Sequence, residues 1–322
     1  MESAELDAVD RGLVHALQID GRAPFARIAD VLGVSEQTVA RRYRRLTAAG
    51  ALRVVGGLDG LLLGYTPWTI RVRCTPDAGT AIAEALARRP DTYWVHLLSG
   101  GTEISCFTQS PDAVLLEKLP RTSRVLGMTA HSLLRGFAVP GGWRGLAWLT
   151  EEQADRLRPE PRTGSDGIVL QEEDHRLVGV LAEDGRAGYA ELARATGWSE
   201  STVKRRLNQL RASGALNIQL DYSPRLLGYR AEARLWMSVR PSELLHVATT
   251  LAGHPEISFA GVTTGPTNLL AAAVCRDNAD LYRYLTERVS ALDAVQTLET
   301  APVLRTMKRT GVLPPRAYVR PS

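Results

Sequence analysis

Four arginines are crowded into the five positions from Arg41 to Arg45. Guanidinium groups bind phosphate oxygens and form paired hydrogen bonds with base edges, so this cluster favours contact with a nucleic acid. It lies in residues 35–52, SEQTVARRYRRLTAAGAL, and a close copy, SESTVKRRLNQLRASGAL, occupies residues 199–216. A solvated helix face is the alternative explanation of the arginines alone, and the double occurrence makes it less favoured.

The copy is part of a longer internal repeat. Residues 6–65 match residues 170–229 without gaps, at a constant offset of 164 residues. Asp20-Gly21-Arg22, for example, falls on Asp184-Gly185-Arg186. The chain of 322 residues is therefore predicted to be a fused duplication with more than one domain in each half.

Each copy is predicted to begin with three short helices. In the first copy, apolar residues recur at helical spacing, and the turn Gly33-Val34-Ser35 separates the second helix from the third. Ser35 is a suitable N-cap, and Gly50 stands where a left-handed residue ends a helix. Two helices joined by such a turn are typical of a helix-turn-helix, and RVVGGLDG after Leu52 is predicted to supply the strand of a wing.

The third helix is predicted to present a polar outer face to double-stranded DNA. Val39, Tyr43 and Leu46 should pack inward, which leaves the basic residues outside. We expect Arg42 and Arg45 to contact phosphates or base edges, and replacing these outward-facing side chains should hardly change stability. The second copy is less positive, and a scaffold role is its alternative. The candidate DNA-binding residues are Ser35, Gln37, Thr38, Arg41, Arg42, Arg44 and Arg45 in the first copy, and Ser199, Ser201, Thr202, Lys204, Arg205, Arg206 and Gln209 in the second.

Beyond the region of high identity, both halves keep one pattern of strands and helices. The order is strand, helix, two strands, helix, strand, which is that of a ferredoxin-like βαββαβ domain. The predicted elements are a strand at 65–74 or 231–240, a helix at 77–90 or 241–255, a hairpin at 92–110 or 257–275, and a second helix at 112–122 or 278–289, followed by a last strand.

The predicted fold class is therefore α+β, with two winged helix-turn-helix domains and two ferredoxin-like βαββαβ domains in one chain. Between the halves, Pro, Gly and charged residues indicate a linker, within which LTEEQADRLR is predicted to form a short helix capped by Thr150. The predicted boundaries are 1–60 and 170–224 for the helix-turn-helix domains, 61–140 and 225–312 for the βαββαβ domains, 141–169 for the linker and 313–322 for a basic tail.

These motifs resemble the Lrp/AsnC, or feast/famine, family of transcriptional regulators. The similarity is carried by residues 6–52, by LLLGY and RLLGY after the two strands, and by VTTGPTNLLAAAVCRDNADLYRYL in the second half. The resemblance implies a DNA-binding regulator whose βαββαβ domains pair subunits and bind a small metabolite, such as an amino acid. The duplication departs from the family pattern and suggests a covalent pseudo-dimer, with further assembly into homo-oligomers expected from the family.

The resemblance also implies effector-binding residues beside the turn of each hairpin. Glu103 in the first half stands opposite Asn268 in the second, which puts a site in the first half in doubt. Turn residues chosen for their backbone conformation are the alternative. The implied residues are Thr264, Gly265, Thr267 and Asn268 in the second half, and Ser99, Gly101 and Glu103 as their weaker counterparts.

Other chemistry is not favoured by the sequence. The six histidines show no metal-ligand spacing, and the chain contains none of the glycine-rich phosphate-binding or nucleophile motifs, so we expect neither a metal nor a cofactor and no enzymatic activity. Cys74, Cys106 and Cys275 lie in apolar, strand-like stretches and are predicted to be buried, reduced thiols.

The composition agrees with a cytoplasmic protein that has no membrane partner. The chain is 44% hydrophobic and 23% charged with a formal net charge of +4, and its first residues are acidic rather than those of a signal peptide. Two alternatives to a regulator stay open. One is an enzyme similar to siroheme decarboxylases, which resemble Lrp/AsnC proteins, although His96 has no neighbouring Tyr-x-Arg. The other is an interaction module without DNA binding.

Overall fold

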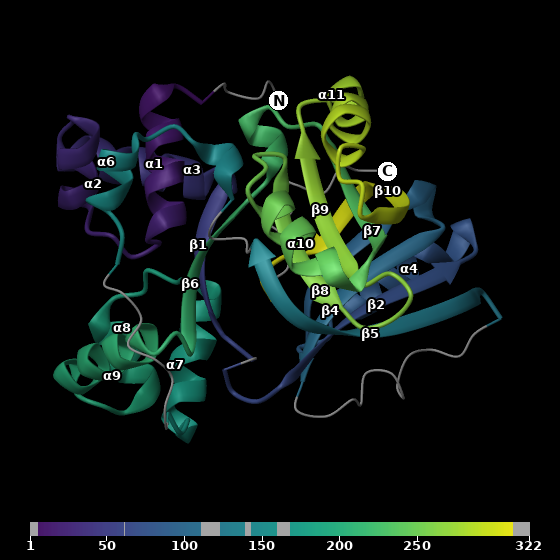
Figure 1. Cartoon of the computed structure of the whole chain (residues 1–322). Coiled ribbons are helices and arrows are strands. Elements are labelled where there is room, and N and C mark those ends of the chain that lie inside the picture. Colours follow the sequence, from purple (N-terminus) through teal and green to yellow (C-terminus); the bar gives the residue numbers. More distant parts are fainter. Residues whose placement is uncertain (1–5, 61, 111–122, 139–142, 160–167, 312–322) are drawn as a thin grey trace. The chain divides into compact units, whose positions relative to one another are not determined.

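A computed structural model of the chain describes residues 6–60, 62–110, 123–138, 143–159 and 168–311. The described residues divide into two compact units. One unit combines residues up to 65 with 147–223, and the other combines 66–146 with 224–311. The units therefore group domains of the same kind from both copies (Figure 1).

The first unit contains two three-helix domains, one from each copy. Apolar side chains from all three helices, such as Leu17, Ile28 and Val39, are fully buried in the first domain. Leu181, Leu192 and Val203 take the matching places in the second. The helices and strands are α1 (Ala8–Ile19), α2 (Phe25–Leu32), α3 (Glu36–Ala48) and β1 (Leu52–Leu58), then α7 (Glu172–Glu183), α8 (Tyr189–Thr196), α9 (Glu200–Ala212) and β6 (Leu216–Tyr222).

The predicted ends of the third helix are confirmed. The Ser35 hydroxyl accepts a hydrogen bond from the backbone N–H of Thr38 at 3.1 Å, and Ser199 does the same for Thr202 at 3.2 Å. Gly50 follows the helix with φ of +65°, the left-handed conformation that glycine adopts without strain. Three-helix domains with a turn before the third helix match the predicted helix-turn-helix.

The predicted wing is wrong in its pairing. Among the described residues of this unit, β1 does not form a hairpin within its own domain but pairs antiparallel with β6 of the other copy. Val55 lies opposite Gln219, its own counterpart in the repeat, so the local two-fold axis passes through this pair. Each copy therefore contributes one strand to a ribbon that joins the two helix-turn-helix domains.

Part of the predicted linker packs on the first helix-turn-helix domain. The short helix is confirmed as α6 (Glu151–Asp155), with Thr150 and Gln153 forming a capping box. His15 Nδ1 accepts hydrogen bonds from the backbone N–H groups of Trp148 and Leu149 at 3.2 and 3.0 Å. These contacts make residues 148–157 a part of this unit.

The second unit is a closed barrel made from two four-stranded sheets. The strand order β10-β3-β4-β2-β5-β8-β9-β7 contains the ferredoxin-like order once for each copy. The elements are β2 (Thr66–Cys74), α4 (Pro76–Ala87), β3 (Thr92–Leu98), β4 (Glu103–Ser110) and β5 (Val125–Ala138), then β7 (Ala231–Val239), α10 (Leu244–Ala252), β8 (Ile257–Thr263), β9 (Leu269–Cys275), α11 (Asn278–Arg283) and β10 (Val295–Lys308). The helix predicted at 112–122 lies outside the described residues.

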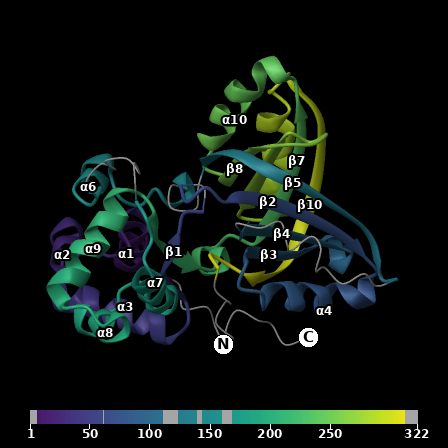
Figure 2. The same ribbon diagram turned by 90° about the horizontal axis from the view of Figure 1, so that it is seen from below.

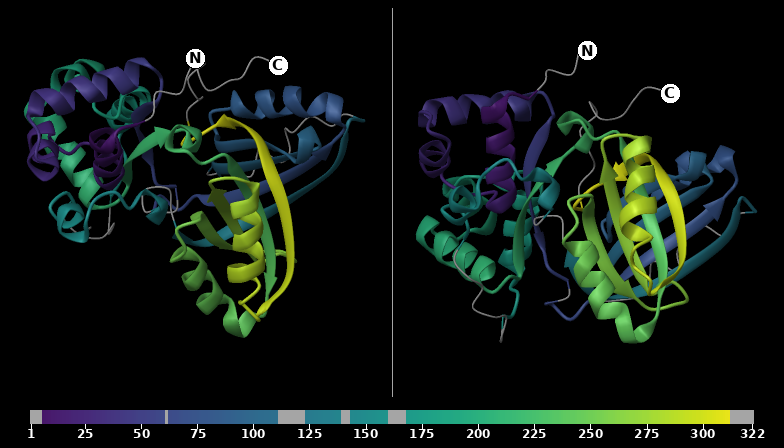
Figure 3. Two further views of the ribbon diagram at one scale, coloured as in Figure 1. Left: turned by 90° about the horizontal axis from the view of Figure 1, so that it is seen from above. Right: turned by 45° about the horizontal axis from the view of Figure 1, so that its top comes forward.

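Two long strands close the barrel by crossing from one copy to the other. The 14-residue strand β10 pairs with β7 of its own copy and then with β3 of the other, and Figure 3 shows it as one continuous strand. In the same way, β5 pairs with β2 and then with β8. Each of the eight described barrel strands is therefore paired on both sides, which removes the main aggregation risk of a ferredoxin-like sheet.

Helices cover the outside of the barrel, and each sheet has a core beneath its helices. Helices α4 and α10 lie on opposite outer sides of the strands (Figure 2). A third, smaller cluster inside the barrel joins Leu98 of the first copy to Trp236 and Leu270 of the second. None of the described helices is long and apolar enough to cross a membrane.

Candidate nucleic-acid interface and ligand region

The third helix of each helix-turn-helix domain carries a pair of exposed basic residues. In α3, Arg41 and Arg44 are exposed, and the Arg44 side chain donates a hydrogen bond to the carbonyl of Ala40 in the same helix. In α9, the exposed pair is Lys204 and Arg205. The remaining predicted residues divide into exposed Ser35, Gln37, Arg45, Ser199, Ser201 and Gln209, and half-buried Thr38, Arg42, Thr202 and Arg206.

The prediction that Arg42 faces outward is wrong, and its replacement is now expected to lower stability. Its Nη1 lies 2.5 Å from Oδ2 of Asp7 and 3.0 Å from Oδ1 of Asp10, and its side chain is 19% exposed. Arg45 also reaches Asp10, at 2.5 Å, yet stays 56% exposed. The acidic first turn of α1 draws Arg42 inward, and that turn is 32 residues away in sequence.

The second domain repeats this ion pair in a more enclosed form. Arg206 donates two hydrogen bonds to Asp174, at 2.9 and 2.6 Å, and the Asp174 side chain is fully buried. Burial raises the pKa of Asp174, but the hydrogen bonds from Arg206 and from the backbone of Gln171 outweigh it, and the net pKa lies below its usual value. The arginine therefore stabilises the domain and keeps the buried carboxylate ionised.

The turn between β8 and β9 carries the predicted effector residues, and Asn268 is already engaged there. Its Oδ1 accepts a hydrogen bond from the backbone N–H of Val239, and its Nδ2 donates to the Val239 carbonyl, both at 2.9 Å. Gly265 has φ of +100°, and a Cβ there would lie 2.2 Å from the His131 ring of the first copy. Thr264 bonds to the backbone of Ser132 in both directions. The side chain of Thr267 is half-buried in the same turn.

The corresponding region of the first copy is a charged network. Glu103 accepts hydrogen bonds from Arg71 at 2.7 Å and from the Ser99 hydroxyl at 3.1 Å. Arg71 also lies 2.5 Å from Glu299 and stacks over the Trp236 ring at 4.3 Å. Gly101 is buried against α4, because its carbonyl would lie 2.0 Å from a Cβ on Gly79. The two turns, related by the repeat, therefore have different chemistry.

Inside the barrel, the structure brings together a histidine and an arginine that the sequence did not connect. His96 and Arg234 lie on the strand faces that carry Leu98 and Trp236, and the Arg234 guanidinium donates to His96 Nε2 at 2.5 Å. Burial, together with the charges of Arg234 and Arg309, holds the pKa of His96 well below its usual value. Burial also lowers the pKa of Arg234, to about 10. A neutral His96 thus accepts from Arg234 and offers its Nδ1 proton to Thr306, 3.1 Å away.

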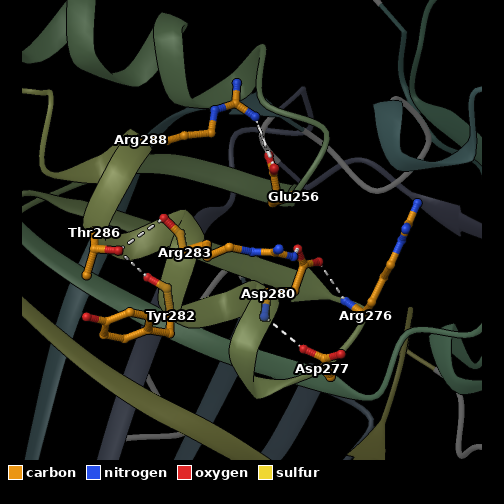
Figure 4. Close-up of polar contacts among 8 residues, drawn as sticks. All are labelled: Glu256, Arg276, Asp277, Asp280, Tyr282, Arg283, Thr286 and Arg288. Carbon is orange, nitrogen blue, oxygen red and sulfur yellow. Dashed lines mark hydrogen bonds and ion pairs between the residues drawn. The ribbon is translucent and has the colours of Figure 1, made fainter.

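Charged residues around α11 bind one another and fasten this helix to the sheet. Asp277 caps the helix by accepting from the N–H of Asp280, and Asp280 accepts from Arg283 at 2.9 Å (Figure 4). Arg288 reaches Glu256 at 2.7 Å. We therefore assign this cluster a structural role.

The thiols do not suggest nucleophilic chemistry. All three cysteines are buried and free, as predicted. Burial raises the pKa of both Cys106 and Cys275 to about 12, so both stay protonated at neutral pH. Within the described ranges, no group of three or more His, Cys, Asp or Glu side chains is arranged to hold a metal ion.

Family models match both kinds of domain. The AsnC-type helix-turn-helix domain matches residues 6–47 and again 172–211, and the Lrp/AsnC ligand binding domain matches residues 232–313. An uncharacterised HTH-type transcriptional regulator of Pyrococcus abyssi is 30% identical over 145 residues, which are 45% of this chain and 91% of the relative. The HTH-type transcriptional regulator FL11 of Pyrococcus horikoshii is 30% identical over 148 residues, 46% of this chain and 97% of the relative. Each of these relatives matches about half of the chain, as expected for a duplication.

A solved structure shares the fold of the whole chain. The crystal structure of the siroheme decarboxylase NirDL matches with a TM-score of 0.64 and covers 97% of this chain and 96% of its own. The two sequences are 17% identical, so the likeness concerns the fold alone.

Proposed function

The chain belongs to the Lrp/AsnC family, and we propose that it is a sequence-specific DNA-binding transcriptional regulator in which one polypeptide does the work of a dimer. The observation that carries the proposal is the pairing of β1 with β6, which joins two helix-turn-helix domains with exposed basic third helices. Pairs of helix-turn-helix domains bind two DNA half-sites that lie about one helical turn apart, or a multiple of one turn. Because the two helices differ, the DNA site need not be palindromic.

The test is to identify DNA bound to the protein in its host by sequencing, and to measure binding of the enriched sites with purified protein. We expect a gel shift that competitor DNA of scrambled sequence does not abolish. Equal affinity for enriched and scrambled sites would contradict a sequence-specific regulator.

A second candidate function is an enzyme acting on a tetrapyrrole. It is favoured by the whole-chain fold shared with NirDL and by the buried pair of His96 and Arg234 inside the barrel, where a cation faces a neutral histidine. An absorbance scan of the purified protein, alone and after addition of an iron tetrapyrrole, separates the candidates. A strong visible band that is retained through gel filtration and weakened in Arg234→Ala supports the enzyme, whereas a colourless protein that shifts DNA supports the regulator.

The proposal includes a small metabolite, such as an amino acid, that binds beside the turn between β8 and β9 and changes DNA affinity. The turn is anchored to β7 by Asn268, and Val239 of β7 pairs with Val295 of β10. A pocket of about 260 Å³ is lined by Leu285, Val289, Leu292 and Val295 among others, and it meets the turn only through the pairing of Val295 with Val239, since no turn residue lines it. A ligand that prefers one barrel arrangement shifts DNA affinity by its differential binding, typically about 5–150-fold.

We expect at least one amino acid to raise the melting temperature of the wild type and to have a smaller effect on Thr267→Val, which keeps the side-chain shape but loses the hydroxyl. Asn268→Ala is not a suitable test, because the loss of both bonds to Val239 should cost about 1–3 kcal/mol of stability without any ligand. The measurement is a thermal-shift screen on both proteins, with Thr80→Val on the outer helix α4 as the matched control. Equal shifts in all three proteins would place the ligand elsewhere.

A further inference from the structure

Two identical Asp-Gly-Arg turns meet where the helix-turn-helix domains face each other. Each turn closes on itself, because Asp20 accepts from the N–H of Arg22 at 2.9 Å and Asp184 accepts from the N–H of Arg186 at 2.8 Å. The central glycines permit a close approach to the ribbon. A Cβ on Gly21 would lie 2.9 Å from side chains of β1 and β6, and one on Gly185 would lie 2.9 Å from β1.

Each arginine binds the turn of the other copy, across the local two-fold axis. Arg22 donates to the carbonyls of Gly185 and Ala187 at 2.7 and 3.0 Å. In return, Arg186 donates to the carbonyls of the matching residues in the first copy, Gly21 and Ala23, at 2.6 and 3.0 Å. The planar fork of a guanidinium suits two neighbouring carbonyls, and a lysine ammonium on its flexible stem has no such fork.

The aromatic contacts of the two arginines differ between the copies. Arg186 stacks over Phe25 at 4.3 Å and lies 5.5 Å from the ring of Tyr43, which belongs to α3. Arg22 lies 5.7 Å from Tyr189, the counterpart of Phe25. The counterpart of Tyr43 in α9 is Leu207, which offers no ring. Arg186 of the second copy therefore contacts α3 of the first through an aromatic ring, whereas the first copy contacts α9 through the ion pair of Asp20 with Arg211 at 2.7 Å.

We propose that this reciprocal Arg22–Arg186 clamp is a positioning device that fixes the distance and angle between α3 and α9, and so sets the spacing of the DNA half-sites that the chain accepts. The ribbon of β1 and β6 has only two strands, and such a pair is marginally stable by itself, so further contacts are needed to hold the angle between the two helices. The clamp adds four hydrogen bonds between the two turns, beside the bond from the Gly185 N–H to the Val54 carbonyl at 2.8 Å and the ion pair of Asp20 with Arg211. The part of this inference that concerns half-site spacing rests on the proposed function, whereas the part that concerns the distance and angle between α3 and α9 does not.

The experiment compares the wild type with Arg22→Ala/Arg186→Ala on DNA carrying one half-site or two half-sites at varied spacing. Half-sites moved by half a helical turn face opposite sides of the duplex. We expect the wild type to prefer its best spacing over this shift by about tenfold or more, and the double variant by less than about threefold. Affinity for a single half-site should stay the same, which a merely destabilised domain would not allow.

Arg11→Ala/Arg176→Ala is the matched control. These arginines are exposed on α1 and α7, one in each copy, so the variant removes the same charge without touching the clamp. It should keep the spacing preference of the wild type. Unchanged spacing preference in Arg22→Ala/Arg186→Ala would overturn the proposal.

A measurement without DNA keeps the inference separate from the proposed function. Spin labels on Gln37→Cys and Ser201→Cys, two exposed and equivalent positions, report the distance between the helices. The distance distribution should be narrow in the wild type and should broaden in the double variant. An equally narrow distribution would overturn the clamp, whereas absence of DNA binding by all proteins would reject only the regulator.

If the double variant fails to fold, the single variants decide. Arg186→Ala should broaden the distribution more than Arg22→Ala, because only Arg186 touches a ring of a reading helix. Arg22→Lys/Arg186→Lys keeps the charge and one hydrogen bond at each side, so it should fall between the wild type and the alanine variants. A distance distribution in the lysine variant as narrow as that of the wild type would show that charge alone, rather than the paired hydrogen bonds, fixes the distance between the two helices.

Discussion

Replacing Arg206 with alanine is expected to lower the stability of the second helix-turn-helix domain by about 3 kcal/mol, because it leaves a buried carboxylate without its cation. Asp174 is fully buried, and among the described residues Arg206 is the one cation that forms an ion pair with it. Arg42→Ala should lower stability by less, because Arg45 still forms an ion pair with Asp10, at 2.5 Å. Denaturant unfolding, combined with hydrogen exchange of the α7 amides, measures both changes.

The pH dependence gives this prediction a sign. The pKa of Asp174 is lowered in the folded protein, so its stabilising contribution is complete above the unfolded pKa of about 3.9 and is lost as the pH falls through the folded value. Without Arg206, burial should raise the pKa of Asp174 in the folded variant. The carboxylate is then neutralised as the pH falls, so the free-energy cost of its unpaired charge decreases. The stability gap between wild type and Arg206→Ala should therefore narrow from pH 7 toward pH 4.

Two further variants test the cause. Arg206→Ala/Asp174→Asn removes the unpaired charge and should recover part of the loss, while Arg205→Ala, on the exposed neighbour, should leave stability unchanged. A fully stable Arg206→Ala, or a gap that widens with acidification, would contradict the assigned role.

Removing the exposed pair Arg41 and Arg44 is expected to weaken DNA binding by on the order of 10²-fold at about 0.1 M salt, and to reduce the slope of log K against log salt by about 2. Both side chains are exposed on α3, so each is free to neutralise one phosphate. Neither forms an ion pair with another described residue, so the melting temperature should stay the same. Fluorescence anisotropy over a salt series measures the slope.

The matching pair on α9 shows whether the second domain also reads DNA. Lys204→Ala/Arg205→Ala removes the same two charges from the equivalent helix. A similar loss of slope is expected if both helices contact the duplex. A slope equal to that of the wild type would make the second domain a scaffold, and an unchanged slope in Arg41→Ala/Arg44→Ala would reject α3 as the reading helix. Arg11→Ala/Arg176→Ala is the charge-matched control for both pairs.

Local features were accessible from the sequence because their causes are local. The repeat is visible as an identity between the two halves, whereas the caps at Ser35 and Ser199 and the turn at Gly50 depend on neighbours within about one helical turn. The order of strands and helices in the βαββαβ domains was likewise predictable from periodicity. These features were sufficient to predict an α+β duplication with two helix-turn-helix domains.

Partner choice was not accessible, because it depends on residues far apart in the chain. A helical wheel places Arg42 at the edge of the polar face, and only the position of Asp7 and Asp10 on α1 turns it inward. The stretch after Leu52 reads equally well as half of a wing and as a strand that pairs with a copy of itself.

The same limit applies to the ligand region and to the clamp. The amide of Asn268 looked free to bind a metabolite until the backbone of Val239, 29 residues away, was found to occupy it. The repeated Asp-Gly-Arg was visible in the sequence as an identity, but its role needs the two turns to lie face to face. For the part of the chain that the structure describes, the sequence by itself determined which helices and strands form in each copy. Only the tertiary structure decided which copy each strand and each arginine would bind, because such contacts depend on chain closure over many residues rather than on local periodicity.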